Sequence, residues 1–89
     1  MTTIQVEQRH IDQGLPQTVD KCPVALAIKG HLAKHEAVHV YEDEIHIGPL
    51  DKPLRLTAPP AVATFIMDFD CDLPTQPFEF DLPLPERKD

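Results

Sequence analysis

Residues 37–49 read AVHVYEDEIHIGP, a run in which apolar and polar side chains alternate on both sides of an acidic centre. Alternation with a period of two is typical of β-strands that bury one face, and residues 42–44 lie where the chain would turn back. This stretch therefore predicts a β-hairpin whose valines and isoleucines face one core. Gly48 and Pro49 would end its second strand.

The same alternation predicts three further strands, at residues 3–7, 54–56 and 78–82. In the last of these, Phe78 and Phe80 share the face that would meet the core. Pro53 precedes residues 54–56, a position where its missing N–H is tolerated. We therefore expect up to five strands.

The spacing of apolar residues changes to a helical one in residues 22–33, which are apolar around most of the helix circumference. Asp20 is the predicted N-cap, and Pro23 lies in the first turn. Such a helix is expected to be buried on two sides. The second side would meet either the rest of this chain or a second copy.

A second helix is predicted to start near residues 57–60, with Thr57 or Ala58 close to its cap and prolines in its first turn. Its apolar stripe consists of Val62, Phe65, Ile66 and Phe69. Residues 8–13 carry a weaker helix signal, which Gly14 would close as a glycine just past the helix end.

The order of these elements predicts an α+β fold. We expect one small, mostly antiparallel sheet of four to five strands, with the two main helices packed on one face. Residues 1–83 would form a single globular domain, and residues 84–89 a flexible, charged tail.

Composition excludes several function classes. Eight Lys and Arg against fifteen Asp and Glu give a net charge of −7, the wrong sign for direct binding to nucleic acid or to an anionic membrane. No apolar stretch is long enough to span a bilayer, and no signal-peptide core is found in the first twenty residues, which predicts a cytoplasmic protein. A chain of 89 residues buries little surface, so we also expect a homodimer.

Two cysteines, Cys22 and Cys71, are too few and too far apart for a disulfide framework, and no CxxC element suggests zinc. We expect reduced, mostly buried thiols. A helix start lowers a thiol pKa, which makes Cys22 the candidate nucleophile, although its apolar surroundings favour buried packing.

The motifs Cys22-Pro23-Val24-Ala25-Leu26-Ala27-Ile28, Phe65-Ile66-x-x-Phe69-Asp70 and Pro77-Phe78-x-Phe80-x-Leu82 resemble a group of small uncharacterised bacteriophage and prophage proteins. The resemblance covers most of the chain. Members of the group carry a glycine shortly after the Phe-Asp pair, where this chain has Cys71 and Asp72. The resemblance implies a phage accessory protein that binds host machinery or host defences, and it assigns no catalytic residue.

Four histidines are candidate ligands. His31 and His35 lie four positions apart near the predicted end of the first main helix, a spacing that a metal pair uses, but no third ligand accompanies them. Side chains that can carry a positive charge are favoured at a helix C-terminus, and we prefer this explanation to a metal site. His39 and His46 lie on the two hairpin strands and are expected to face each other on a solvated face. We predict no metal and no cofactor.

Acidic side chains gather late in the chain, and we take them as candidates for an interaction surface: Asp68, Asp70, Asp72, Glu79 and Asp81. A solvated outer face, a basic protein partner and imitation of DNA phosphates compete as explanations. Two of these carboxylates could in principle act as a catalytic pair, but the sequence indicates no cleft between them. The chain also carries no nucleotide-loop or hydrolase motif.

These observations predict a small phage-type accessory protein that binds a host factor or defence component in the host cytoplasm, without catalysis. Two alternatives stay open: a protein that sequesters a small ligand between subunits, and an acidic inhibitor that mimics DNA. A third, an enzyme using Cys22 or the pair His31 and His35, is a weaker hypothesis.

Overall fold

The computed structural model of the chain describes residues 2–32, 36–49 and 51–84. The described residues form five strands and three helices: β1 (Thr2–Val6), α1 (Gln8–Gln13), α2 (Pro23–Lys29), β2 (Val38–Val40), β3 (Glu44–Ile47), β4 (Leu54–Thr57), α3 (Pro60–Asp70) and β5 (Phe78–Leu82). The α+β class and each predicted strand are confirmed. Leu84 packs against the core, and residues 85–89 of the predicted tail lie outside the described residues.

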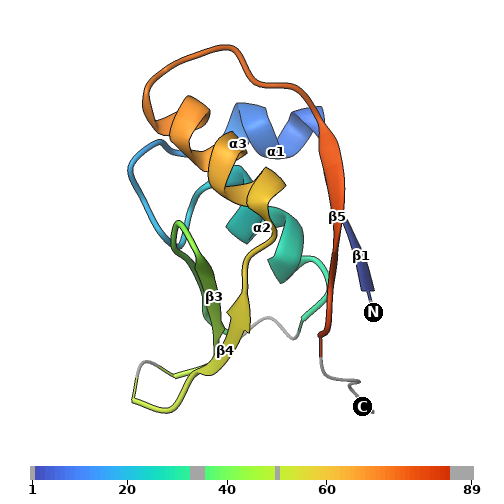
Figure 1. Cartoon of the computed structure of the whole chain (residues 1–89), viewed down its shortest axis with the longest axis vertical. Helices are drawn as coiled ribbons and strands as arrows, with labels where there is room; N and C mark the ends of the chain where they lie inside the picture. Colours follow the sequence, from blue (N-terminus) through green and yellow to red (C-terminus); the bar gives the residue numbers. More distant parts are fainter. Residues whose placement is uncertain (1, 33–35, 50, 85–89) are drawn as a thin grey trace.

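The strands form two antiparallel sheets rather than the single sheet we expected. β1 pairs with β5, with Thr2 opposite Leu82, and β3 lies between β2 and β4 in the second sheet. Figure 1 shows the two sheets on different sides of the helices, so the helices do not share one face of a common sheet. Each sheet therefore covers a different side of the helical part of the molecule.

Helix α2 explains this division, because five of its seven residues are buried. It packs against α1, against β1 of one sheet and against β2 of the other. Both of its apolar sides are therefore covered within the chain. The argument for a homodimer from an uncovered helix face no longer applies.

The ends of α2 differ from the sequence prediction. The N-cap is Cys22 rather than Asp20, because the Cys22 Sγ accepts a hydrogen bond from the Ala25 N–H at 3.4 Å. The carbonyl oxygen of Asp20 instead accepts from the Lys29 Nζ at 3.0 Å. The helix ends at Lys29, with Gly30 as its C-cap, whereas we expected it to continue to residue 33, which lies outside the described residues.

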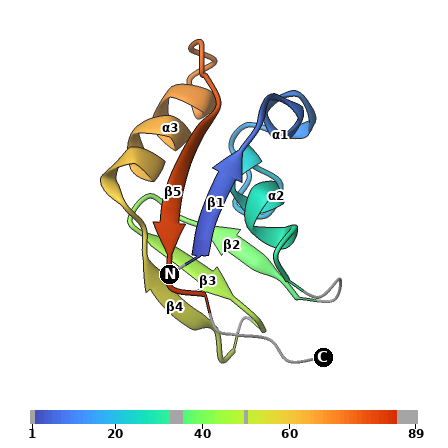
Figure 2. The same cartoon turned by 90° about the vertical axis from the view of Figure 1, so that its right-hand side faces the viewer.

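Helix α3 is held to β5 by aromatic packing. The Phe65 ring lies 4.7 Å from the Phe78 ring and 6.1 Å from the Phe69 ring, measured between centroids, and Phe78 stacks in turn on Phe80 at 5.7 Å. All four phenylalanines of the chain take part. Figure 2 shows the result, with α3 beside β5 and α2 beside β1. The predicted stripe is confirmed in α3, where Val62 and Phe65 are buried and Ile66 and Phe69 half-buried.

Helix α3 begins and ends close to where the sequence predicts, and the structure shows which residues form its caps. Its N-cap is Pro59, directly after Ala58, and Pro60 lies in the first turn as predicted. At the C-terminal end, the Asp72 N–H donates to the Phe69 carbonyl at 3.1 Å and the Leu73 N–H to the Asp68 carbonyl at 2.9 Å. This is the Schellman pattern, which requires a left-handed residue just past the helix, and Asp72 takes that role with a φ of 60°.

The core is apolar throughout. Its sixteen buried hydrophobic residues come from every element except α1 and β4, and among the described residues no polar or charged residue is buried. Such apolar packing stabilises the fold but places no charged or polar residue in the interior of the described structure. Within the described residues, no helix is both long enough and apolar enough to cross a membrane.

Candidate functional site

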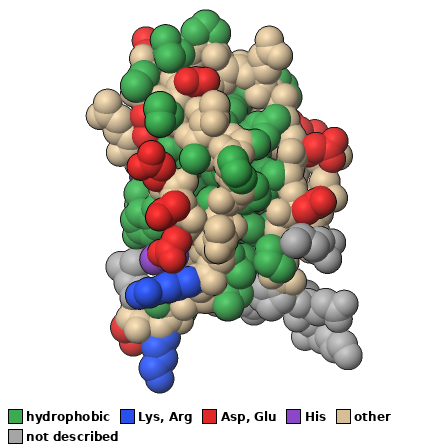
Figure 3. Space-filling model, in the orientation of Figure 1, with side chains coloured by type: hydrophobic (Ala, Val, Ile, Leu, Met, Phe, Trp, Pro, Cys, Tyr) green, Lys and Arg blue, Asp and Glu red, His purple; other side chains and the backbone are tan. Residues whose placement is uncertain are grey.

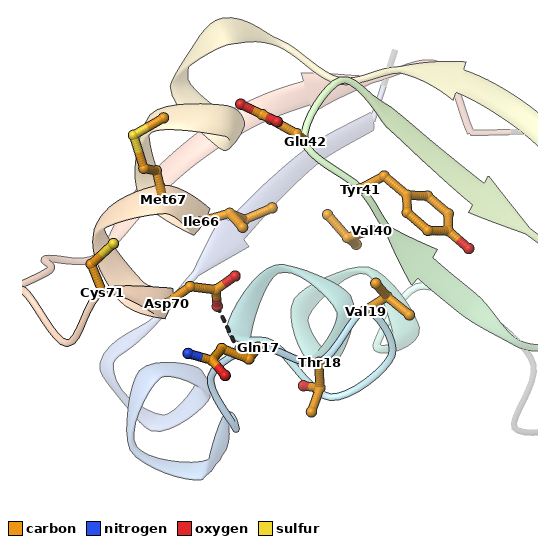
Figure 4. A pocket seen from close by; sticks show the side chains of 10 residues that line it. All are labelled: Gln17, Thr18, Val19, Val40, Tyr41, Glu42, Ile66, Met67, Asp70 and Cys71. Atoms are coloured by element: carbon orange, nitrogen blue, oxygen red, sulfur yellow. Dashed lines mark hydrogen bonds between the residues drawn. The ribbon is translucent and has the colours of Figure 1, made fainter.

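A groove of about 410 Å³ lies between the exposed side of α3, the end of β2 with its hairpin turn, and the loop before α2. We call it the α3 groove (Figure 4). It is lined by Gln17, Thr18, Val19, Val40, Tyr41, Glu42, Ile66, Met67, Asp70 and Cys71. Three segments far apart in the sequence therefore meet at this site.

The surface of the groove is mainly apolar. The Ile66 and Val40 side chains point toward each other across its centre (Figure 4). Around them, Val19, Tyr41 and Met67 are exposed by 38%, 37% and 56%. Side chains of this size are usually buried in a small domain, so their exposure around one hollow marks a surface suited to being covered.

One side of the groove is a loop tied to α3 by a carboxylate. The Asp70 Oδ1 accepts a hydrogen bond from the Gln17 N–H at 2.8 Å, and Gln17 has a left-handed backbone with a φ of 62°. The Val40 N–H donates to the Val19 carbonyl oxygen at 2.7 Å, which joins the loop to the edge of β2. Asp70 and β2 together hold this loop in place.

The charges at the groove are negative. Glu42 and Asp70 lie on opposite sides of the apolar centre (Figure 4), and among the described lining residues none is a Lys, Arg or His. Figure 3 shows acidic side chains along the left flank of the molecule, with Lys and Arg gathered below them. An apolar hollow with acidic edges thus faces the solvent.

The two thiols differ in their surroundings. Cys71 is exposed and lines the groove, whereas Cys22 is buried, and both are free. Burial raises the pKa of the Cys22 thiol and the nearby charge of Asp70 adds to this, although backbone N–H groups at the start of α2 oppose it. The helix start that could have activated Cys22 is thus outweighed by its burial.

The structure divides the predicted acidic candidates between two regions. Asp68, Asp70 and Asp72 lie at the C-terminal end of α3, and Asp70 lines the groove. Glu79 and Asp81 lie on the exposed face of β5, on the other side of the molecule (Figure 1), where the Asp81 Oδ1 accepts from the Thr3 hydroxyl at 2.8 Å. The five carboxylates therefore do not form one surface.

His39 and His46 are direct partners in the register of β2 and β3, as predicted. Both are half-buried, so the expectation that they lie on a solvated face was wrong. The His46 Nε2 lies 3.0 Å from the Glu44 Oε1, and its ring packs on Tyr41 with centroids 4.8 Å apart. The His39 Nδ1 is buried and lacks a hydrogen-bond partner. Within the described residues, no group of three potential ligands is positioned to hold a metal ion.

His31 lies at a second, more polar hollow of about 350 Å³. Its other charged or titratable residues are Glu7, Arg9 and His10, and the Arg9 Nε is already paired with the Glu7 Oε1 at 2.8 Å. His35, the other half of the predicted metal pair, lies outside the described residues.

The groove-lining residues Val19, Tyr41 and Met67 were missed by the sequence analysis. Val19 lies in a polar stretch, Tyr41 at the end of an alternating strand, and Met67 on the α3 face opposite the predicted stripe. Each is an apolar side chain where the local pattern calls for a polar one. That mismatch is the signal by which they could have been found.

Comparisons of the chain with protein-family models, with curated proteins and with solved structures found no match. The resemblance to small phage proteins therefore stays a prediction. The functional argument depends on the site itself.

Proposed function

We propose that the protein acts by binding, without catalysis, and that the α3 groove takes a segment of a partner protein. The observation that supports this most is the exposure of Val19, Tyr41 and Met67 around one hollow. Covering apolar surface of this kind gains about 25 cal/mol for each Å² removed from water. An apolar hollow with a few polar groups at its edges is the usual form of a binding site.

The proposal of a non-catalytic role rests on the state of the candidate nucleophile. Cys22 is buried, and burial raises the pKa of its thiol, which disfavours the reactive thiolate. Its Sγ is also engaged as the cap of α2. The predicted phage-type origin makes a host protein the partner that we expect.

Selection from a displayed library of random peptides on the purified protein tests the proposal. We expect enriched peptides whose binding shifts NMR signals of residues 17–19, 40–42 and 66–71. The substitution Met67→Ser should weaken their binding about tenfold, because it removes the most exposed apolar side chain of the groove.

The matched control is Leu54→Ser. Leu54 is 42% exposed and lies on β4, outside the α3 groove, so its loss should leave peptide affinity unchanged. Enriched peptides that bind elsewhere, or that bind Met67→Ser as tightly as the wild type, contradict the proposal. A small molecule retained in native mass spectrometry and lost in Met67→Ser would favour ligand sequestration instead.

A further inference from the structure

The charges around the α3 groove restrict what can occupy it. Glu42 and Asp70 flank its apolar centre, and no described residue among its lining supplies a positive charge. The whole chain carries a net charge of −7. An acidic or neutral partner would leave these carboxylates uncompensated at the edge of the interface, whereas a basic one pairs with them.

A second copy of this chain is a poor occupant for the same reason. In a symmetric dimer through the groove, the same surface meets itself, so Glu42 and Asp70 of both copies would approach one another. Like charges brought together at an interface suppress association. Charge complementarity therefore favours a different protein over self-association.

The backbone at the groove limits the form of the partner. The Val40 N–H, on the edge of β2, already donates to the Val19 carbonyl. The Gln17 and Tyr41 N–H groups are also engaged, with the Asp70 carboxylate and the Glu44 carbonyl. A partner strand cannot use these donors to extend the sheet, so the groove offers side-chain surface rather than a strand edge.

We infer that the occupant is a short amphipathic helix of a partner protein, with Lys or Arg beside its apolar stripe. This rests on the proposed function and specifies its partner. Apolar side chains one helical turn apart would cover Ile66 and Met67. The flanking cations would lie beside Glu42 and Asp70, which makes these two carboxylates the residues that determine specificity.

Three synthetic peptides that share one Ala-rich helical frame test the inference. Each carries Leu and Phe one turn apart, and their flanking positions are all Lys, all Gln or all Glu. We expect the Lys peptide to bind the full chain about tenfold more tightly than the Glu peptide. This preference should shrink in about 0.5 M salt, where charges are screened within a few Å.

The double variant Glu42→Gln with Asp70→Asn should weaken the Lys peptide about fivefold and remove most of its advantage over the Glu peptide, because the carboxylates that attract Lys and repel Glu are gone. Asp70→Asn keeps an oxygen that can accept from the Gln17 N–H. The matched control, Glu79→Gln with Asp81→Asn, removes the same charge from the exposed face of β5 and should leave the preference for Lys intact.

The outcomes separate the inference from the proposed function. Equal binding of the Lys and Gln peptides would contradict the inference that the partner is basic. It would still support the proposal that the α3 groove binds a peptide. Undiminished binding of a Lys peptide whose helix is broken by proline overturns the helical form. If none of the three peptides binds and the library selection also fails, the proposed function itself is overturned. A dimer that Met67→Ser dissociates would make a second copy the occupant.

Discussion

Gly14 is needed for the close approach of the loop after α1 to the start of α2. A Cβ at this position would lie 2.6 Å from the Pro23 Cδ and 2.8 Å from its backbone nitrogen, closer than packed atoms allow. Gly30 differs, since it has ordinary helical angles and its Cβ would meet only the Ala27 carbonyl oxygen, at 3.4 Å. Alanine substitutions at these two glycines are therefore expected to change the free energy of unfolding in opposite directions.

We expect Gly14→Ala to lower the free energy of unfolding by about 1–3 kcal/mol, because ring and backbone would both have to move. Gly30→Ala should raise it by about 0.5–1 kcal/mol by reducing the freedom of the unfolded chain. Urea denaturation of the two variants beside the wild type measures both. A Gly14→Ala protein as stable as the wild type would show that the loop after α1 does not approach Pro23 as closely as described.

His10 gives the protein a dependence of stability on pH. Its Nδ1 accepts a hydrogen bond from the Glu7 N–H at 2.9 Å, a role open to the neutral ring. Burial lowers the pKa of His10 and the Arg9 charge adds to this, while the Glu7 charge opposes both. The folded pKa thus lies below the ordinary value of 6.5, so between the two values the unfolded chain binds more protons than the folded protein.

The contribution of His10 is therefore fully present above pH 6.5 and is lost as the pH falls toward the lowered folded pKa. We expect His10→Gln, whose amide oxygen can accept the same bond without titrating, to match the wild type at about pH 8 and to exceed it at about pH 5. Urea denaturation across this range measures the difference. Parallel pH curves for the two proteins would contradict this account.

At the scale of elements, the C-terminal end of α3 carries a strained residue. Asp72 has a left-handed backbone, which glycine adopts without cost, and its charge lies at the negative end of the helix dipole. The resemblance to phage proteins predicts a glycine close to this position. We expect Asp72→Gly to raise the free energy of unfolding by about 1 kcal/mol, as measured by thermal denaturation.

Asp72→Asn separates the two causes, since asparagine tolerates the left-handed region and carries no charge. A gain from glycine that asparagine does not reproduce assigns the cost to the backbone, whereas equal gains assign it to the charge. A lower free energy of unfolding for Asp72→Gly than for the wild type would contradict the claim that Asp72 is strained.

Local patterns were enough to predict most elements, because strand alternation and helical stripes are properties of neighbouring residues. Helix ends were harder to predict. The cap of α2 depends on the Cys22 Sγ reaching the Ala25 N–H, while Asp20, the better N-cap by type, lies two residues too early. The preference of a residue type for a cap says little about which residue the fold places there.

At the scale of the whole molecule, the division into two sheets could not be predicted from the sequence. Strand pairing joins residues far apart, and the alternation in β1 fits a place beside β5 or beside β2 equally well. The candidate site could not be predicted from the sequence for the same reason. Asp70 was chosen for its charge, but the α3 groove exists because tertiary packing brings residues 17–19 and 40–42 to α3.

The pairing of β1 with β5 also determines when the protein can finish folding during synthesis. The Thr3 hydroxyl bonds to Asp81 across 78 positions, and within the described residues β1 has β5 as its sole strand partner. A ribosome adds about 5–20 residues each second, so the backbone of β1 waits roughly 4–16 seconds for its partner to be made. Throughout that time, the nascent chain presents an unpaired strand to chaperones and to neighbouring chains.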